Sequence, residues 1–466
     1  MTPARVALAQ VLAAAGLDPA AAGGIEIGGA DPVLPTGFLI GTAGAATLGA
    51  VGLAADRLWC ARGGGPQRIA IDLRAAAFAL RSERHLTVDG RQPPGGWSPL
   101  SGFYRTADGG WIQLHCNFPH HRDGVLRLLG AADDRAAVAA RISTRPPGEL
   151  EDALAAAGLC AAMVRSGAEW AAHPQGAAVA AQPLIAITRL GDAPAEPVDR
   201  RAPGPRRPLA GVRVLELSRV LAGPVAGRTL AAHGATVLRI GAAHLPCVPR
   251  FLLDTGHGKV NAEIDLDAPG GPERLAALAR EADVFVQAYR PGSLARRGFG
   301  PGDLARLRPG IVYVAVSAYG DGPWQGRRGF DTLVQAASGL AAEEGGDVPR
   351  HLPAQALDYA TGHLAALGAM AALERRAREG GSWLVRLSLA ATARWLAGLG
   401  RVPDPAAARA LADPGADDVD DLMMATDGPF GRIRHLAPAL RMSGTPPHWT
   451  RPPAPLGSHP AAWPAD

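Results

Sequence analysis

Residues 212–240, VRVLELSRVLAGPVAGRTLAAHGATVLRI, form the stretch that decides the fold. The apolar run at 212–217 is typical of a buried strand, and the helical pattern after it stops at Gly234. A second apolar run occupies 236–240. Two strands joined through a helix at this spacing pair in parallel with a right-handed crossover, so the stretch predicts an α/β fold.

The alternation of strands and helices continues after this unit. Apolar runs at 262–266, 283–289 and 311–320 are typical of strands, and 270–282 has a helical pattern. We therefore expect one parallel sheet in a large domain. Nearer the N-terminus, two β-prone runs within 98–116 flank Asp108-Gly109-Gly110, which predicts a hairpin in a smaller α+β domain.

Two stretches of the chain echo each other. Residues 356–376 read ALDYATGHLAALGAMAALERR, and residues 38–57 read FLIGTAGAATLGAVGLAADR. Each stretch begins an apolar helix that is followed by an Arg/Gly turn and a strand, so that residues 38–73 resemble residues 357–389. A weaker echo relates residues 183–206 to residues 438–457. Only the later helix carries an acid at its start, Asp358.

Asp358 has two interpretations. A carboxylate at a helix N-terminus can cap the helix by accepting the free N–H groups of the first turn. The positive end of the helix dipole would also keep that carboxylate ionised. It would then be able to act as a nucleophile, with nearby amides to hold an oxyanion. The residues alone leave both interpretations open.

The composition excludes several classes of function. The formal net charge is only +4, and no run of basic residues suits a nucleic acid. Residues 33–55 carry no charge, but Pro35 and many small residues favour a buried helix over a membrane span. The four cysteines are scattered without a CxxC pair, which favours a reducing cytoplasm over a disulfide framework. We therefore expect a cytoplasmic protein with no nucleic-acid or membrane partner.

Common cofactor motifs are incomplete. LAGPVAG (221–227) is not the GxGxxG fingerprint, and Gly241-Ala242 follow the second strand where an acid would bind ribose. GHGKVN (256–261) lacks the spacing of a P-loop. A cluster of possible metal ligands lies at His115, Cys116, His120 and His121. No second pair exists at finger spacing, so we expect a surface loop, no metal and no permanently bound cofactor.

Several segments within 208–400 resemble, in order, the family III CoA-transferases. They are PLAGVRVLELSRVLAGPVAGRTLAAHGATVLRI, GHGKVNAEIDLDAPGG, ADVFVQAYRPGSLARRGFG, VAVSAYGDGPW, FDTLVQAASGL and ALDYATGHLAALGAMAALERR. That family includes formyl-CoA, carnitine and bile-acid CoA-transferases, with α-methylacyl-CoA racemase as a relative. The resemblance implies a Rossmann-like large domain, a small domain and an interlocked homodimer. It also implies acyl-CoA and a carboxylic acid as partners, with coenzyme A as cosubstrate.

The N-terminal half resembles a later part of the same family. We therefore expect a rearranged fusion, like a circular permutation in which one helix is duplicated. The first copy of that helix shows Leu39-Ile40 where the family's Asp would lie. The expected units are a partial large-domain-like segment (1–95), a small domain (96–185), a linker (186–208), a Rossmann-like CoA-binding catalytic domain (209–400), and a tail ending in loops that resembles the family C-terminus (401–466).

The resemblance also assigns roles to residues. Asp358 matches the family nucleophile, whose carboxylate attacks an acyl-CoA thioester and becomes an aspartyl-CoA thioester, from which an acceptor acid takes the CoA. Tyr289 is expected to stack on adenine, and Lys259, the only lysine, to neutralise phosphate together with arginines. The expected CoA contacts are Val220, Leu221, Lys259, Ile264, Asp265, Leu266, Asp267, Ala288, Tyr289, Arg290, Arg296, Ser317, Tyr319 and Gly320.

Two positions depart from the family pattern. Gly241-Ala242 replace the acid and Arg that usually follow the second strand, which removes a nucleotide contact. GFD (329–331) places Phe330 where the racemases carry a His, so two-base epimerisation is disfavoured relative to transfer. A racemase-type enzyme and a non-catalytic or partner-dependent homologue remain alternatives. We expect an acyl pocket of small apolar residues without a diagnostic charge, so the donor and acceptor acids are not identified.

Overall fold

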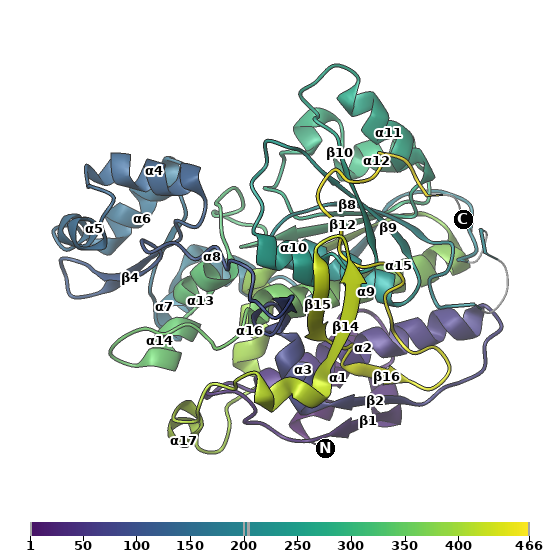
Figure 1. The fold of residues 1–466 in the computed structure, drawn as a ribbon, viewed down its shortest axis with the longest axis horizontal. Helices are drawn as coiled ribbons and strands as arrows, with labels where there is room; N and C mark the ends of the chain where they lie inside the picture. The colour runs from purple at the N-terminus through teal and green to yellow at the C-terminus, as the bar shows by residue number, and fades with distance from the viewer. Residues whose placement is uncertain (1, 199–200, 203–205, 465–466) are drawn as a thin grey trace.

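A large, mostly parallel sheet forms the centre of the computed structural model, which describes residues 2–198, 201–202 and 206–464 (Figure 1). Its seven strands run in the order β10-β9-β8-β11-β12-β13-β7, which confirms the α/β class. The parallel part of this sheet starts at β8, and the chain adds β9 and β10 on one side and then β11, β12 and β13 on the other, whereas β7, earlier in the chain, lies at the edge beyond β13. The strands are β7 (Ala186–Gly191), β8 (Arg213–Leu217), β9 (Thr236–Gly241), β10 (Lys259–Glu263), β11 (Val284–Gln287), β12 (Val312–Ser317) and β13 (Ser382–Ser388).

Helices cover both faces of this sheet, which explains why its strands are apolar runs. Successive side chains point to opposite faces, so Val214 packs in one core and Leu215 in the other. The Val214 core includes α9 (Ala222–Ala232) and α15 (Ala356–Glu379). The Leu215 core includes α11 (Gly271–Glu281) and α12 (Pro301–Leu307).

A second, antiparallel sheet stands at one side of the molecule with its own core (Figure 1). The predicted hairpin is confirmed as β4 (Gly102–Arg105) and β5 (Trp111–Leu114), and Asp108 accepts a hydrogen bond from the Gly110 N–H in its turn. The other elements of this unit are β6 (Ala161–Met163), α4 (Pro119–Leu129), α5 (Arg135–Ile142) and α6 (Pro147–Ala156). α7 (Gly167–Ala172) and α8 (Pro174–Ala180) follow, and α13 (Asp331–Ala337) packs against β5 and β6.

The N-terminal segment and the C-terminal tail build one structure together. β1 (Ile25–Gly28), β2 (Ile69–Asp72) and β16 (Leu440–Met442) form a three-stranded sheet, and β14 (Met423–Gly428) and β15 (Gly431–Leu436) form another with β3 (Thr87–Val88). The tail thus contributes strands before it ends, as expected, in loops over residues 443–464. The remaining helices are α1 (Pro3–Ala14), α2 (Ile40–Ala61), α3 (Leu73–Ala79), α10 (Pro249–Thr255), α14 (Leu340–Gly345), α16 (Leu389–Gly398) and α17 (Pro405–Arg409).

The predicted linker at 186–208 also needs a correction. Residues 186–191 form β7, which pairs antiparallel with β13 at the edge of the large sheet. A six-residue edge strand among Pro and Arg residues gives little periodic signal, and its partner lies about two hundred residues away in the chain. Among the described residues, no helix has both the length and the hydropathy that a membrane crossing requires.

The two echoing helices occupy similar settings. α2 packs against α15, and each is followed by a strand, β2 or β13. β2 pairs in parallel with β1 and antiparallel with β16, and β13 pairs in parallel with β12 and antiparallel with β7. The weaker echo therefore corresponds to the two antiparallel partners, β7 and β16.

A carboxylate also caps each of these helices. Asp31 accepts the N–H groups of Gly41 (2.9 Å) and Thr42 (2.8 Å) in the first turn of α2. Asp331 accepts those of Leu357 and Asp358, both at 2.9 Å, in the first turn of α15. The sequence pattern placed the start of the first copy at residue 38. The capping carboxylate of Asp31 shows that the similarity begins earlier in the chain.

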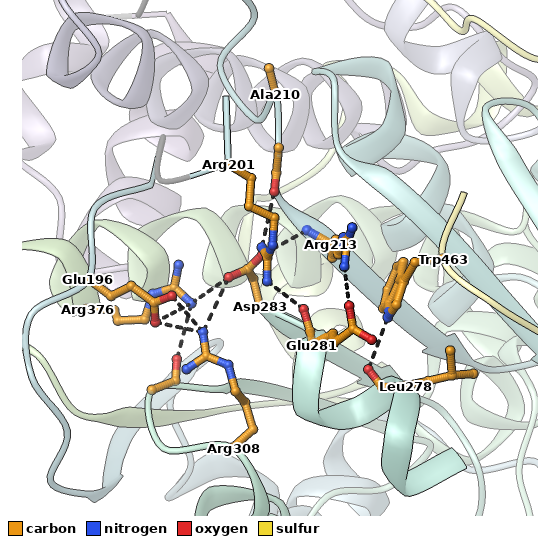
Figure 2. Close-up of polar contacts among 12 residues, drawn as sticks. Glu196, Arg201, Ala210, Arg213, Leu278, Glu281, Asp283, Arg308, Arg376 and Trp463 are labelled. Atoms are coloured by element: carbon orange, nitrogen blue, oxygen red, sulfur yellow. Dashed lines mark hydrogen bonds and ion pairs between the residues drawn. The ribbon is translucent and has the colours of Figure 1, made fainter. Parts of the chain in front are cut away.

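A buried ionic cluster holds the far end of α15 and the connecting segment (Figure 2). Asp283, just before β11, accepts a hydrogen bond from the Arg213 N–H (2.9 Å) and pairs with Arg201. It also pairs with Arg376 Nη1 at 3.1 Å, near the end of α15. Both side chains of the Arg376–Asp283 pair are almost fully buried, so α15 is fixed near each end by a carboxylate.

Candidate active site

A cavity of about 320 Å³ opens at the carboxyl edge of the large sheet. Its walls come from the loops after β8, β11 and β12, from α4 in the smaller unit, and from the start of α15. The loops after β8 and β11 meet here, where the order of the sheet reverses. Ligands of open α/β sheets bind in this crevice, outside the carboxyl ends of the strands.

Asp358 lines the cavity and does not cap its helix. The first-turn N–H groups of Leu357 and Asp358 are donated to Asp331, which is 1% exposed. Gln355 precedes α15 without a side-chain cap. The capping interpretation of Asp358 is therefore wrong. Because Asp331 performs that role, the carboxyl group of Asp358 is not needed as a cap. Asp358 is 7% exposed and lines the cavity.

The surroundings of Asp358 oppose its ionisation. Burial raises the pKa of Asp358 well above its ordinary value, and the nearby carboxyl groups of Asp331 and Glu83 raise it further. A backbone hydrogen bond from Ala222 acts in the opposite direction. Burial also raises the pKa of Asp331 to about 6. Burial among carboxyl groups therefore acts against the helix dipole, which was expected to keep Asp358 ionised.

The loop from β8 to α9 reaches Asp358 through an unusual backbone and a close helix crossing. Val220 has φ +68°, a conformation that is strained for a β-branched residue and is found mostly at functional sites. A Cβ at Gly362 would lie 2.6 Å from Val225 and 2.7 Å from the Ala222 carbonyl oxygen. The glycine in α15 thus lets α9 come close enough for the Ala222 N–H to reach Asp358.

Most of the expected CoA contacts lie in three adjoining cavities. The Asp358 cavity includes Val220, Leu221, Ala288, Tyr289, Arg290 and Ser317. A second cavity, of about 170 Å³, shares Tyr289 and includes Gly241, Ala242, Ile264, Asp265, Leu266 and Asp267. A third, of about 200 Å³, shares Arg290 and Ser317 and includes Gly320. The strand expected at 262–266 is β10, Lys259–Glu263, so residues 264–267 belong to the loop at its carboxyl end.

Three expected contacts lie outside these cavities. Tyr319 is buried in a hydrophobic core, and Arg296 is exposed. Lys259 is 1% exposed, and its ammonium group donates to the Pro224 carbonyl oxygen (2.7 Å) and pairs with Glu216 Oε2 at 2.6 Å. The expectation that Lys259 neutralises phosphate is therefore wrong, because a buried carboxylate already compensates its charge.

The histidine cluster is not a surface loop. His115 and His121 are buried, His121 lines the Asp358 cavity, and His115 stacks on Phe330 with ring centroids 3.9 Å apart. Burial lowers the pKa of His115 and of His121 to about 3, so both imidazoles are neutral. Across the described residues, no group of three His, Cys, Asp or Glu is arranged to hold a metal ion.

Several site residues were not expected from the sequence. Glu83 accepts a hydrogen bond from the Tyr359 hydroxyl (3.0 Å), 276 residues away, so no local pattern signals it. Beside the expected Arg290, the cavity carries three arginines that were not expected, Arg219, Arg327 and Arg328. The expectation of a pocket without a diagnostic charge is therefore wrong. The doubled Arg327-Arg328 before the GFD motif was the available signal.

Comparisons with known proteins show which proteins the chain is similar to. The chain is 34% identical over 328 residues to "Acyl-CoA transferase" of Gibberella moniliformis, covering 63% of this chain and 56% of that protein. It is 34% identical to "Probable fatty acyl-CoA transferase Rv3272" of Mycobacterium tuberculosis, over 40% of this chain and 51% of that one. It is 35% identical to "Succinyl-CoA:glutarate CoA-transferase" of Mus musculus, over 37% and 43%.

The chain thus spans about half the length of the curated relatives it matches. The model of CoA-transferase family III matches residues 13–190 and 209–402, which is well over half of the chain and includes Asp358 with its cavity. The chain therefore belongs to CoA-transferase family III.

Proposed function

We propose that this protein transfers CoA from an acyl-CoA donor to a carboxylic acid through Asp358. The carboxylate attacks the thioester carbon and expels the CoA thiolate, which leaves a mixed anhydride. The thiolate then attacks the aspartyl carbonyl carbon and releases the donor acid, so that an aspartyl-CoA thioester remains. The acceptor acid takes the CoA by the same two steps in reverse, and Asp358 returns to its carboxylate form.

One observation carries this proposal: Asp358 is freed from helix capping by Asp331 and lines the cavity. The raised pKa of Asp358 fits the same chemistry. Burial beside Asp331 and Glu83 disfavours the carboxylate, whereas the anhydride and the thioester carry no charge on this residue. The site thus favours the covalent forms relative to the free, ionised side chain.

We place the nucleotide of CoA toward the second cavity and its thioester at Asp358. Tyr289 lines both cavities, so its ring is available for stacking on the adenine. Arg290 lines the Asp358 cavity and is available to phosphate. Lys259 has no part in this assignment.

The arrangement of the chain supports a rearranged fusion. Matched capping carboxylates and matched strand partners at α2 and α15 are what a duplicated segment would leave behind. The Asp358 cavity takes walls from both halves of the chain. A homodimer is part of the proposal, and light scattering should then give twice the chain mass of 47.9 kDa.

Adduct formation tests the proposed function. The protein is first titrated with free CoA by calorimetry, where micromolar binding, about −8 kcal/mol, shows a competent site. It is then incubated with a panel of acyl-CoAs and digested, and mass spectrometry should find CoA or acyl mass on the peptide that contains Asp358. Asp358→Asn should abolish the adduct and keep CoA binding, whereas the exposed Asp347→Asn should change neither.

The other outcomes distinguish the alternatives. An adduct that persists in Asp358→Asn would show that the nucleophile is assigned wrongly. CoA binding without any adduct or turnover would favour a non-catalytic homologue. Exchange of the α-proton of a 2-methylacyl-CoA in deuterium oxide, without transfer, would favour a racemase-type reaction.

A further inference from the structure

Three of the four arginines that line the Asp358 cavity have no carboxylate partner. Arg327 pairs with Asp152 at 2.5 Å. Over residues 2–198, 201–202 and 206–464, no carboxylate lies within ion-pair distance of Arg219, Arg290 or Arg328. Uncompensated guanidinium groups around one cavity indicate an anionic ligand.

Arg328 is held by a neutral group of the smaller unit. Its Nη1 lies 2.9 Å from His121 Nε2, and the sulfur of Cys160 lies 3.6 Å from the same ring. Because His121 is neutral, its Nε2 accepts the hydrogen bond from Arg328 and does not compensate the charge. The other N–H groups of the guanidinium have no acceptor among the described residues and are available to a ligand.

The position of Arg328 relates it to the reacting end of the cavity. Arg219 lies over the rings of both Tyr289 and Phe118, 5.8 Å and 5.9 Å from their centroids. Arg328 is joined through Gly329 and Phe330 to Asp331, which caps the helix of Asp358. The rings of Phe118 and Phe330, with centroids 6.0 Å apart, line the same cavity as Arg328 and Asp358 and give it an apolar wall.

We propose that Arg328 binds a second carboxylate, at the far end of the acyl chain, so that the protein uses dicarboxylic acids and their CoA thioesters. The proposal rests on the proposed function. A guanidinium fork suits a carboxylate through two parallel hydrogen bonds, and the aromatic wall suits the methylene groups between the two acid functions. His121 acts as a positioning residue, because it orients the guanidinium without contacting the substrate.

Binding measurements on Asp358→Asn protein, which avoid turnover, test this proposal. Calorimetry compares free CoA, butyryl-CoA, succinyl-CoA and glutaryl-CoA. At least one of the two diacid thioesters should bind about tenfold tighter than butyryl-CoA, as expected for one charge-assisted contact. Adding Arg328→Met should remove that preference and leave the affinity for CoA and butyryl-CoA unchanged. Arg141→Met is the control and should keep the preference, because Arg141 is an exposed arginine on α5 of the smaller unit.

Two further variants separate folding from recognition. Arg328→Lys keeps the charge and should keep part of the preference even if the Met variant folds poorly, which thermal unfolding by circular dichroism shows. His121→Phe should reduce the diacid preference and leave CoA affinity intact. A purely structural role of His121 would instead weaken the binding of all four ligands alike.

The remaining outcomes overturn the proposal in distinguishable ways. Equal binding of diacid and monoacid thioesters would overturn it and leave the proposed function standing. Equal weakening of free CoA and all thioesters by Arg328→Met would identify Arg328 as a phosphate contact. No binding of CoA in any form would overturn both proposals, whereas a diacid preference without an Asp358 adduct would overturn only the transferase reaction.

Discussion

Asp331 determines the state of Asp358 in two ways. It accepts the two N–H groups that Asp358 would otherwise cap, and its own carboxyl group raises the pKa of Asp358. A carboxyl group must be ionised to attack a thioester. Activity should therefore rise with pH through the pKa of Asp358, above the range of an ordinary aspartate.

Asp331→Asn should move this rise to lower pH. The substitution removes a neighbouring charge that raises the pKa of Asp358, while the amide oxygen keeps part of the cap. Profiles of kcat/KM against pH measure the shift. Asp134→Asn is the matched control, because Asp134 caps α5 in the smaller unit (2.8 Å to the Ala137 N–H). Because Asn caps a helix about as well as Asp, both variants should lose little stability, but only the first should change the profile. An unchanged profile in Asp331→Asn would contradict this account of Asp358.

Lys259 should matter for stability and not for CoA binding. Lys259→Met leaves the Glu216 carboxylate buried without its partner, which should cost about 3–5 kcal/mol of unfolding free energy in urea. The double variant Lys259→Met with Glu216→Leu should recover part of this loss, because, of this group, only Arg239, which lies 3.8 Å from Glu216, then remains as a buried charge. Weaker CoA binding without a loss of stability would instead show that Lys259 contacts the phosphates of CoA.

The crossing of α9 and α15 is the element-scale feature that assembles the site. Gly362 is surrounded by Val225 and the Ala222 carbonyl group, so any side chain there must push the helices apart. That movement would also withdraw the Ala222 N–H from Asp358. The helix contact and the environment of the proposed nucleophile therefore depend on the same glycine.

Gly362→Ala should cost about 1–3 kcal/mol through overpacking and reduce activity further than this stability loss explains. Thermal unfolding and single-turnover rates measure the two effects. Gly398→Ala is the matched control, because Gly398 lies at the exposed end of α16 with open space around its Cα. The control should keep its activity and gain up to about 1 kcal/mol from helix propensity. Equal activity in both variants would show that the crossing does not position Asp358.

At the scale of the whole molecule, local patterns predicted the elements but not the contacts between them. β8, β9 and β11 are apolar runs within a few residues of their predicted bounds, because burial on both faces leaves a strong signal. β7 and β16 are short edge strands and leave almost none. The site depends on pairs far apart in the chain, such as Arg328 with His121, 207 residues away. Asp358 was found because a family motif surrounds it, whereas Arg328, although it directly precedes the GFD motif, was missed because its partner His121 is far away in the chain.

The two halves of the chain depend on each other. Walls of the Asp358 cavity, the hydrogen bond from Tyr359 to Glu83 and the packing of α2 on α15 all join residues before the connecting segment to residues after it. A chain cut between residues 202 and 203 keeps Glu196 and Arg201 on the first fragment and Asp283, Arg308 and Arg376 on the second.

Fragments 1–202 and 203–466, expressed together, should therefore co-purify and bind CoA, whereas 203–466 alone should not bind it. Arg376→Met in the second fragment should weaken the association, because Glu196 on the first fragment then loses the Arg376 guanidinium, 3.7 Å away, as a partner. Pull-down yield and calorimetric titration measure both effects. Arg378→Met is the control, because Arg378 is an exposed arginine in the last turn of α15 that pairs only with the neighbouring Glu379 among the described residues. A second fragment that unfolds cooperatively and binds CoA on its own would show that the site belongs to one half, and that the first half is not needed to complete it.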